Sequence, residues 1–368
     1  MNTSRIDFAA CTRGGLALLA CLAVGLIGTE RSRAAAEELP KVKVVSLQRV
    51  FHNGEHNAFT DLCRFQGRFY LTFRSCPDGH SVHPTASIIV LSSEDAQTWE
   101  QVHRFRVEKR DTRDPHFLIF QDKLFVYTGT WYCGERSPSR EEYEMNRHLG
   151  YAAWSPDGRQ WHGPVMLEGT YGHYVWRAAT HGGKAYLCGR RKHEFADTDG
   201  FRNFSREIVE SAMLESDDGL IWRKAALFLQ TNGDETTFLF EEDGRVLAVG
   251  RRGSGKAQLC RSRPPYTDWE RLDLDRYIGG PLVTKWADRY VVGGRNTLSG
   301  SAKTSLCWLV GDELEEFLEL PSGGDNSYPG FVELSPTRAL VSYYSSHEKD
   351  DEGKTITAIY LAELAIDE

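Results

Sequence analysis

The sequence predicts an all-β fold, a six-bladed β-propeller with four-stranded blades, from three observations. A turn of the form Ser-x-Asp-small-x-x-Trp occurs at residues 93–99, 155–161 and 216–222, and its tryptophans lie 62 and 61 residues apart. An apolar hairpin precedes each of these turns, and similar hairpins continue to the end of the chain. The 34 glycines and 11% aromatic residues are typical of many short strands and turns. Self-similarity at such a period marks repeat folds such as propellers.

The first 36 residues have the features of a secretory signal peptide. Arg5 and Arg13 lie near the start, residues 14–28 are uncharged and largely apolar, and Ala34-Ala35-Ala36 offers a cleavage site. Such an apolar stretch is too short to span a bilayer comfortably. We therefore expect a secreted or periplasmic protein with no stable membrane span after cleavage, whose single propeller domain covers residues 37–368. An uncleaved anchor and lipid attachment at Cys21 are the alternatives.

Charge and cysteine content restrict the class of partner. Removal of residues 1–36 takes away four Lys/Arg and two Asp/Glu, so the net charge changes from −8 to −10. Nucleic-acid backbones require clustered cations, and none are visible. Six of the eight cysteines lie beyond residue 36, without zinc-like spacing, and their pairing stays open. His52 and His56 have Gly54 between them, which breaks the helix that such metal spacing needs. We expect a monomer without metal or cofactor.

The strands can be assigned in order from six hairpins. Each hairpin has an apolar strand, a polar or glycine turn and a second apolar strand, and the six occupy residues 58–74, 114–129, 174–190, 235–252, 281–295 and 328–344. Two further short strands complete each blade of roughly 54 residues. The last hairpin has no Trp turn after it. We therefore expect residues 42–50 to pair with residues 356–365, since an open ring would leave two unpaired edges.

Blade geometry assigns the polar residues to the two faces of the disc. The Trp turns lie on one face, where Asp95, Asp157 and Asp218 are expected to bind their own turn backbone and to be structural. The starts of the first strands and the ends of the second strands lie on the other face. That face carries carboxylates, guanidiniums and aromatic rings: Asp61, Arg113, Asp114, Trp176, Arg177, Asp234, Glu235, Tyr328, Arg74, Asp78, His80, Arg190, Arg191, Arg251, Arg252, Arg295 and His347. Such a set favours a site for a polar, anionic or hydroxyl-rich ligand.

The Trp turns resemble the Asp-boxes, or BNR repeats, of the sialidases. Residues 234–251 also resemble the sialidase segment in which a Glu is followed by Asp-Gly-Arg and then by an active-site Arg. The resemblance covers essentially the whole chain after residue 36. It implies an exo-glycosidase, a hydrolase that removes a terminal sugar such as sialic acid from a glycan. It also implies site roles: Tyr328 as nucleophile, Glu235 as its activating carboxylate, Asp78 in the acid loop, and Arg251 (or Arg252) and Arg295 as carboxylate-binding arginines.

The first blade departs from the sialidase pattern. Sialidases have an Arg in a Tyr/Phe-Arg-Ile-Pro segment there, whereas this chain has Asn57-Ala58-Phe59-Thr60-Asp61-Leu62. A missing Arg removes a bidentate pair of charge-assisted hydrogen bonds to a carboxylate, each worth about 1.5–3 kcal/mol. Arg74 and Arg177 are the candidates for a replacement. His80, Arg113 and Trp176 complete the expected substrate contacts.

Two other hypotheses use the same face. Asp61, Asp114 in Arg113-Asp114-Pro115, and Glu235 resemble the base, orienting and acid carboxylates of the five-bladed invertase- and arabinanase-like glycosidases. Two carboxylates suffice for glycoside hydrolysis. The other hypothesis is a lectin-like propeller that binds a glycan without cleaving it, since a fold does not define a function. Six hairpins and intact Trp turns favour the sialidase-like hypothesis over the five-bladed one, and an acid, a base, a Tyr and several Arg on one face favour a glycosidase over a binder.

Overall fold

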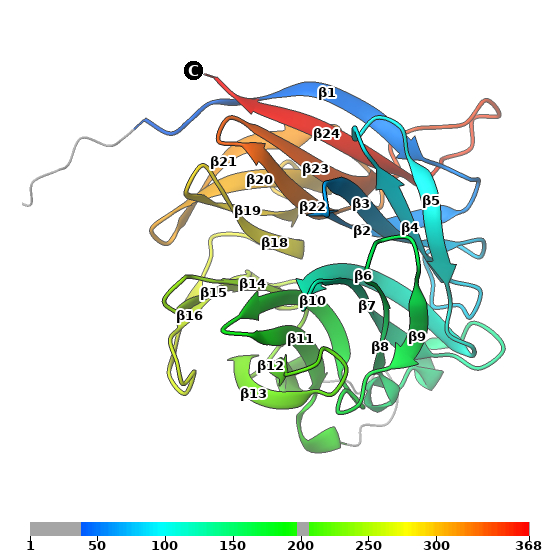
Figure 1. The fold of residues 1–368 in the computed structure, drawn as a ribbon, viewed down its shortest axis with the longest axis vertical. Helices are drawn as coiled ribbons and strands as arrows, with labels where there is room; N and C mark the ends of the chain where they lie inside the picture. The colour runs from blue at the N-terminus through cyan, green and yellow to red at the C-terminus, as the bar shows by residue number, and fades with distance from the viewer. Residues whose placement is uncertain (1–37, 197–205, 368) are drawn as a thin grey trace, which may run out of the picture. The chain divides into compact units, whose positions relative to one another are not determined.

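Six antiparallel sheets of four strands each follow one another in the computed structural model, which describes residues 38–196 and 206–367 (Figure 1). Blade 1 consists of β2 (His56–Phe65), β3 (Arg68–Cys76), β4 (Ser87–Ser93) and β5 (Glu100–Phe105), and blade 2 of β6 (Arg110–Phe120), β7 (Lys123–Tyr132), β8 (Leu149–Ser155) and β9 (His162–Met166). Blade 3 consists of β10 (Tyr174–His181), β11 (Lys184–Lys192), β12 (Val209–Ser216) and β13 (Arg223–Leu229), and blade 4 of β14 (Thr236–Phe240), β15 (Val246–Gly250), β16 (Gln258–Ser262) and β17 (Trp269–Asp273). Blade 5 consists of β18 (Gly279–Trp286), β19 (Arg289–Asn296), β20 (Lys303–Val310) and β21 (Glu313–Leu320), and blade 6 of β22 (Asn326–Ser335), β23 (Arg338–Ser345), β24 (Ala358–Ile366) and β1 (Val42–Phe51). This is the predicted six-bladed β-propeller.

Short 3-10 helices lie in the loops of the described chain: η1 (Arg140–Glu142), η2 (Met145–Arg147), η3 (His193–Phe195) and η5 (Arg206–Ile208). None of the helices within residues 38–196 and 206–367 has the length and apolar character that a membrane-crossing helix needs. The expected signal peptide, residues 1–36, lies outside the described residues.

The ring closes through a strand from each end of the chain, as predicted. β1 pairs antiparallel with β24, from Val42 opposite Ile366 to Phe51 opposite Ile359. Figure 1 shows the blue β1 beside the red β24. The indole N–H of Trp308, in blade 5, also donates to the carbonyl of Pro40 at 3.2 Å. The first residues of the domain thus complete blade 6 and contact blade 5.

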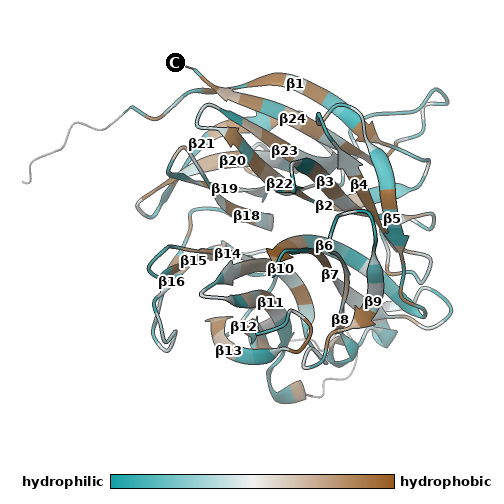
Figure 2. Ribbon diagram, viewed as in Figure 1, coloured by the Kyte–Doolittle hydropathy of each residue, from teal (hydrophilic) through white to brown (hydrophobic). Residues whose placement is uncertain are grey.

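The core lies within and between the blades. All seven residues of β4 are buried, whereas the outermost strand β5 is mostly exposed or half-buried. In Figure 2 the loops are largely hydrophilic and strands such as β1 carry alternating hydrophilic and hydrophobic bands. Such alternation is expected where one face of a strand packs on a core. Trp176, Trp286 and Trp308 are almost completely buried.

A β-bulge recurs near the start of the first strand in five of the six blades. The register shifts in β2, β6, β10, β18 and β22. Four of the bulge residues have left-handed backbone conformations: Phe59 (φ 64°), Asp114 (φ 53°), Gly280 (φ 58°) and Tyr328 (φ 54°). Trp176 occupies the corresponding bulge of β10. A bulge redirects side chains and is common beside functional sites. For a non-glycine residue this conformation costs about 1–3 kcal/mol.

The Trp turns connect the third and fourth strands of blades 1, 2 and 3, at the ends opposite to these bulges. In blade 2, Asp157 Oδ1 accepts hydrogen bonds from the backbone N–H groups of Arg159 at 2.8 Å and Gln160 at 2.7 Å. Asp95 and Asp218 make the same pair of bonds in their own turns. These aspartates therefore bind turn backbone, as the sequence predicts.

Replacement of Gly158 by alanine is expected to lower the melting temperature without changing the candidate site. Gly158 has a φ of 72°, and a Cβ there would lie 1.8 Å from the hydroxyl of the buried Tyr70 in blade 1. The conformation alone costs an alanine about 1–2 kcal/mol, and the contact adds to this. Gly353→Ala is the control, because Gly353 has a φ of 78° with open space around it. Equal melting temperatures for the two variants would contradict the inter-blade contact.

Candidate active site

Tyr328 and Glu235, from different blades, form the buried centre of the candidate site. Tyr328 is the bulge residue of β22, and Glu235 lies directly before β14. The Tyr328 hydroxyl donates a hydrogen bond of 2.5 Å to Glu235 Oε1, and each residue is only 5% exposed. A phenol is therefore held against a carboxylate where little water can reach.

The other oxygen of Glu235 is held from the opposite side. Oε2 accepts hydrogen bonds from Arg251 Nη1 at 2.9 Å and from the backbone N–H of Gly280 at 3.0 Å. A Cβ on Gly280 would lie 2.5 Å from the Tyr328 ring. Glycine thus lets the backbone of blade 5 approach the pair closely, and the carboxylate has a fixed orientation.

Electrostatics keep the charge of this pair on Glu235. Burial acts to raise the pKa of Glu235, but the nearby charges of Arg251 and Arg190 outweigh it and hold the pKa below its ordinary value. Burial, together with the charge of Glu235, raises the pKa of Tyr328 well above its ordinary value. At neutral pH the pair is a neutral phenol beside a carboxylate that can accept its proton.

Asp114 is a second carboxyl group, and its environment raises its pKa, whereas that of Glu235 is lowered. It is buried at the bulge of β6, and one oxygen accepts a hydrogen bond from the Tyr174 hydroxyl. The other oxygen is buried without a hydrogen-bond partner. Burial and the charge of Glu235 raise the pKa of Asp114 to about 6. Two carboxyl groups with pKa values moved apart are suited to separate acid and base roles.

Arg251 and Arg295 lie beside the Tyr328–Glu235 pair, and each side chain is 21% exposed. Arg251 Nε donates to the carbonyl of Gly253 at 3.0 Å. The guanidinium of Arg295 lies 5.9 Å from the centre of the Tyr328 ring and donates to the carbonyl of Asn326. These contacts leave both cations partly open to solvent next to the buried pair.

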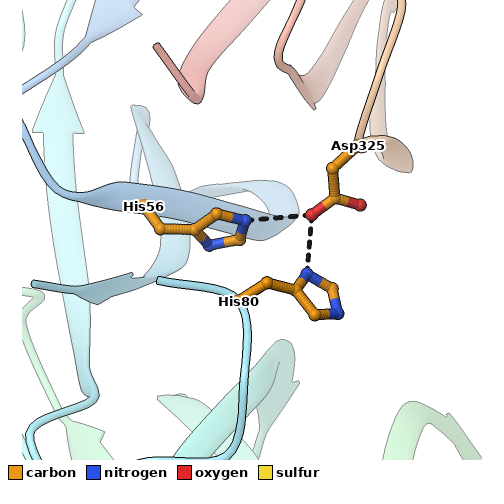
Figure 3. A group of neighbouring side chains, drawn as sticks. All are labelled: His56, His80 and Asp325. Atoms are coloured by element: carbon orange, nitrogen blue, oxygen red, sulfur yellow. Dashed lines mark hydrogen bonds and ion pairs between the residues drawn. The ribbon is translucent and has the colours of Figure 1, made fainter. Parts of the chain in front are cut away.

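A partly buried polar cluster of His56, His80 and Asp325 (Figure 3) lies beside Arg295, and His80 is its most exposed member. Asp325 Oδ2 is 2.9 Å from His56 Nε2 and 2.6 Å from His80 Nδ1. Asp325 Oδ1 accepts hydrogen bonds from the Tyr344 hydroxyl at 2.8 Å and Arg295 Nη2 at 3.1 Å. The sequence assigns His80 to the site but not Asp325 or Tyr344, and it offers His56 only as a partner of His52 in a helical metal spacing that Gly54 excludes. Asp325 directly precedes β22, the first strand of blade 6. The expectation that functional residues lie at the starts of first strands would have identified Asp325 if it had been applied to this position.

Aromatic rings connect this polar cluster with the buried pair. The Phe59 ring centre lies 5.7 Å from that of His80 and 4.9 Å from that of Tyr328. Trp176 is buried and its ring contacts Tyr328 edge-on at 6.2 Å. In the structure Trp176 packs against the proposed nucleophile.

Other residues that the sequence assigns to the site are held in ion pairs. Asp61 Oδ1 accepts a hydrogen bond of 2.9 Å from Arg177 Nη1, and Asp61 Oδ2 accepts one of 2.8 Å from the Phe117 backbone N–H. Arg177 also donates to the carbonyl of Pro329 at 2.6 Å. Both oxygens of Asp61 are thus occupied by groups of blades 2 and 3.

Arg74 and Arg113 both bind the buried Asp111, Arg74 through its Nε at 3.0 Å and Arg113 through its Nε at 2.8 Å. Arg252 lies at the surface and pairs with Asp273 at 3.0 Å. Asp78 accepts a hydrogen bond from the Thr85 hydroxyl at 2.6 Å and pairs with His83 at 3.0 Å, within its own loop. None of the contacts described for these residues joins them directly to the Tyr328–Glu235 pair.

Comparisons with known proteins support the fold. No protein-family model and no curated protein matches the sequence. A protein of unknown function from Dyadobacter fermentans is 20% identical with a TM-score of 0.71, over 89% of this chain and all of that one. Trypanosoma rangeli sialidase in complex with the inhibitor DANA is 11% identical with a TM-score of 0.63, over 88% of this chain and 60% of that one. A family 117 glycoside hydrolase from Zobellia galactanivorans is 15% identical with a TM-score of 0.50, over 88% and 90%.

At these identities the similarity shows the fold alone. The chain is a six-bladed β-propeller of the sialidase-like kind, with the architecture found in glycoside hydrolases. The chain spans about 60% of the length of the trypanosomal sialidase that it matches.

Proposed function

We propose that this protein is a glycoside hydrolase that removes a terminal, negatively charged sugar from a glycan by way of a tyrosine nucleophile. The observation that carries the proposal is the buried 2.5 Å hydrogen bond from the Tyr328 hydroxyl to Glu235. A phenol is a weak nucleophile unless an adjacent base accepts its proton. Glu235 is ionised, fixed by Arg251 and Gly280, and placed to do so.

The three groups account for a double displacement. The Tyr328 oxygen attacks the anomeric carbon and passes its proton to Glu235, while the glycosidic bond breaks and the leaving oxygen takes the proton of Asp114. Water then attacks the anomeric carbon and gives a proton to Asp114. The bond to the Tyr328 oxygen breaks as that oxygen recovers its proton from Glu235. Two displacements give net retention at the anomeric carbon.

The charges around the pair support an anionic sugar. Arg251 and Arg295 are both partly exposed beside Tyr328, and guanidinium groups bind carboxylates by charge-assisted hydrogen bonds. A carboxylate on the substrate would repel an attacking Asp or Glu, whereas a phenol carries no charge. Sialic acid is therefore the first substrate to test, and the sialidase neighbour supports that choice.

Hydrolysis of a panel of 4-methylumbelliferyl glycosides tests the proposal. The panel contains a sialoside, a hexuronide, a neutral hexoside and an arabinofuranoside. We expect turnover of an acidic glycoside and none of the neutral hexoside. Turnover of only the arabinofuranoside, abolished by Asp61→Asn, would establish the arabinanase-like hypothesis instead. Binding on a glycan array without turnover of any panel member would establish the lectin-like one.

The activity is expected to fall as the pH rises through about 6, the pKa to which burial and Glu235 raise Asp114. An acid donates its proton only below its pKa, so kcat/KM should decrease about tenfold per pH unit above that value. Asp114→Asn should remove this limb and lower kcat at pH 5 by about 10²–10⁴-fold. A wild-type profile that stays flat from pH 5 to pH 8 would exclude Asp114 as the acid.

A further inference from the structure

We propose that His56, His80 and Asp325 bind a divalent transition-metal ion, with Zn²⁺ as the best match, beside the candidate active site (Figure 3). The three side chains each offer one donor atom, and these atoms all lie within 4.8 Å of one another. Imidazole nitrogen and carboxylate oxygen are ligands that Zn²⁺ takes in proteins. This inference does not depend on the proposed hydrolase activity.

The donor atoms are close to the spacing that a zinc ion needs. Asp325 Oδ2 lies 2.9 Å from His56 Nε2 and 2.6 Å from His80 Nδ1. Tetrahedral bonds of about 2.0–2.2 Å place neighbouring ligand atoms about 3.3–3.6 Å apart. Outward shifts of a few tenths of an ångström at each donor atom would therefore admit the ion. The His80 side chain is 55% exposed, so an ion can reach the site from solvent.

His80 lies in the loop between β3 and β4, yet its backbone is held by two buried arginines. Arg74 donates to the carbonyls of Gly79 and Ser81, the residues on either side, each at 3.0 Å. Arg113 donates to the carbonyl of His80 itself at 3.0 Å. Such support suits a metal ligand, because its position must be fixed before the ion arrives.

The other two ligands are supported in the same way. Next to His56, the buried Asn57 side chain donates to the carbonyls of Glu55 at 3.0 Å and Thr357 at 3.2 Å. The second oxygen of Asp325 accepts hydrogen bonds from Tyr344 and Arg295. Ligating carboxylates in metal sites are commonly oriented by such outer partners. The three ligands come from blade 1 and from the loop before blade 6, so the ion would bridge the first and last blades.

A second group, Cys76, Asp78 and His83, also brings metal-binding atoms together. It is the weaker candidate because its donor atoms all contact the hydroxyl of Thr85, a residue outside the group. The Thr85 hydroxyl is 2.7 Å from His83 Nδ1 and 2.6 Å from Asp78 Oδ2. Because His83 lies in the same loop as His80, it provides a matched control for the experiment.

The test is calorimetric titration of ZnCl₂ into the purified, chelator-treated protein and into His80→Gln and His83→Gln. We expect one equivalent of Zn²⁺ in the wild type and in His83→Gln, with a melting temperature that rises when Zn²⁺ is added. His80→Gln should bind Zn²⁺ at least about 100-fold more weakly. Loss of a residue that only orients a ligand already costs up to about 100-fold in metal affinity, and this variant loses a ligand itself. The melting temperature without metal, measured for all three proteins, verifies that the variants are folded.

Three results would overturn the proposal. The first is no binding by the wild type at millimolar Zn²⁺. The second is equal affinity in the wild type and His80→Gln. The third is loss of binding in His83→Gln alone, which would assign the ion to the Cys76 group. Should His80→Gln fail to fold, Asp325→Asn replaces it, with the same expected loss. The titration needs no substrate, so it is decided separately from the glycosidase assay.

Discussion

Tyr328→Phe is expected to lower kcat at least about 10³-fold on whichever glycoside the protein cleaves, with little change in ligand affinity. The variant loses only the hydroxyl that Glu235 is placed to deprotonate. The ring contacts of Tyr328 with Phe59 and Trp176 remain, so the propeller should stay folded. Steady-state kinetics and the melting temperature measure the two effects.

Tyr343→Phe is the matched control for this change. Tyr343 is buried in the same blade and its hydroxyl also donates a hydrogen bond, to the carbonyl of Pro321 at 2.9 Å, but none of its described contacts involves the Tyr328–Glu235 pair. It should keep normal turnover. A covalent adduct on Tyr328, detected by mass spectrometry after reaction with a fluorinated glycoside, would identify the nucleophile directly. Full activity in Tyr328→Phe would rule out the mechanism.

Removal of β1 is expected to have the largest effect on stability. A chain that begins at His52 lacks the strand that pairs with β24 along residues 42–51. The loss exposes an unpaired edge and opens the ring. Loss of a whole ladder costs several kcal/mol, so we expect a decrease in melting temperature on the order of 10 °C or more. The reference is a chain that begins at Glu37, and thermal unfolding followed by circular dichroism gives the comparison.

Rescue in trans separates ring closure from a general folding defect. A synthetic peptide of residues 41–51 can pair with the free edge of β24, as donor strands do in other sheets. Added to the shortened chain, it should restore much of the lost stability, and a peptide with proline at the position of Leu47 should not. Equal stability of the chains that begin at Glu37 and at His52 would contradict the closure role of β1.

The fold was predictable because its signals are local and repeated. Trp99, Trp161 and Trp222 mark one turn per blade, and each hairpin has its own apolar pattern. Closure by β1 followed from counting, since the sixth hairpin had too few strands after it. The predicted range of 42–50 differs by one residue from the observed strand, Val42–Phe51.

The candidate site was less predictable because its contacts cross between blades. The sequence places Asp61 and Arg177 on the functional face, but it does not predict that they pair with each other. Nor does it predict that the Phe117 backbone N–H occupies the second oxygen of Asp61. Asp78 and His80 are two residues apart in one loop. Only the loop's fold, held by Arg74, turns His80 toward Asp325 and leaves Asp78 with Thr85.

The bulge of β22 directs Tyr328 toward Glu235, and the sequence contains only a weak signal for the bulges. Asp114, Gly280 and Tyr328 all have left-handed conformations and all directly precede a proline. A residue before proline normally prefers an extended backbone, so the motif by itself predicts the wrong conformation. The inter-blade packing imposes the conformation that directs the phenol to Glu235.

The positions of Asp114, Glu235 and Tyr328 in blades 2, 4 and 6 also bear on how the protein is made. Glu235 and Tyr328 are 93 residues apart. At about 5–20 residues per second, the ribosome adds the tyrosine about 5–20 s after the glutamate. Blade 6 then needs β1, the first strand synthesised, to be complete. Under the proposed mechanism, a nascent chain shorter than 328 residues therefore lacks the proposed nucleophile, even once it carries the proposed base and acid.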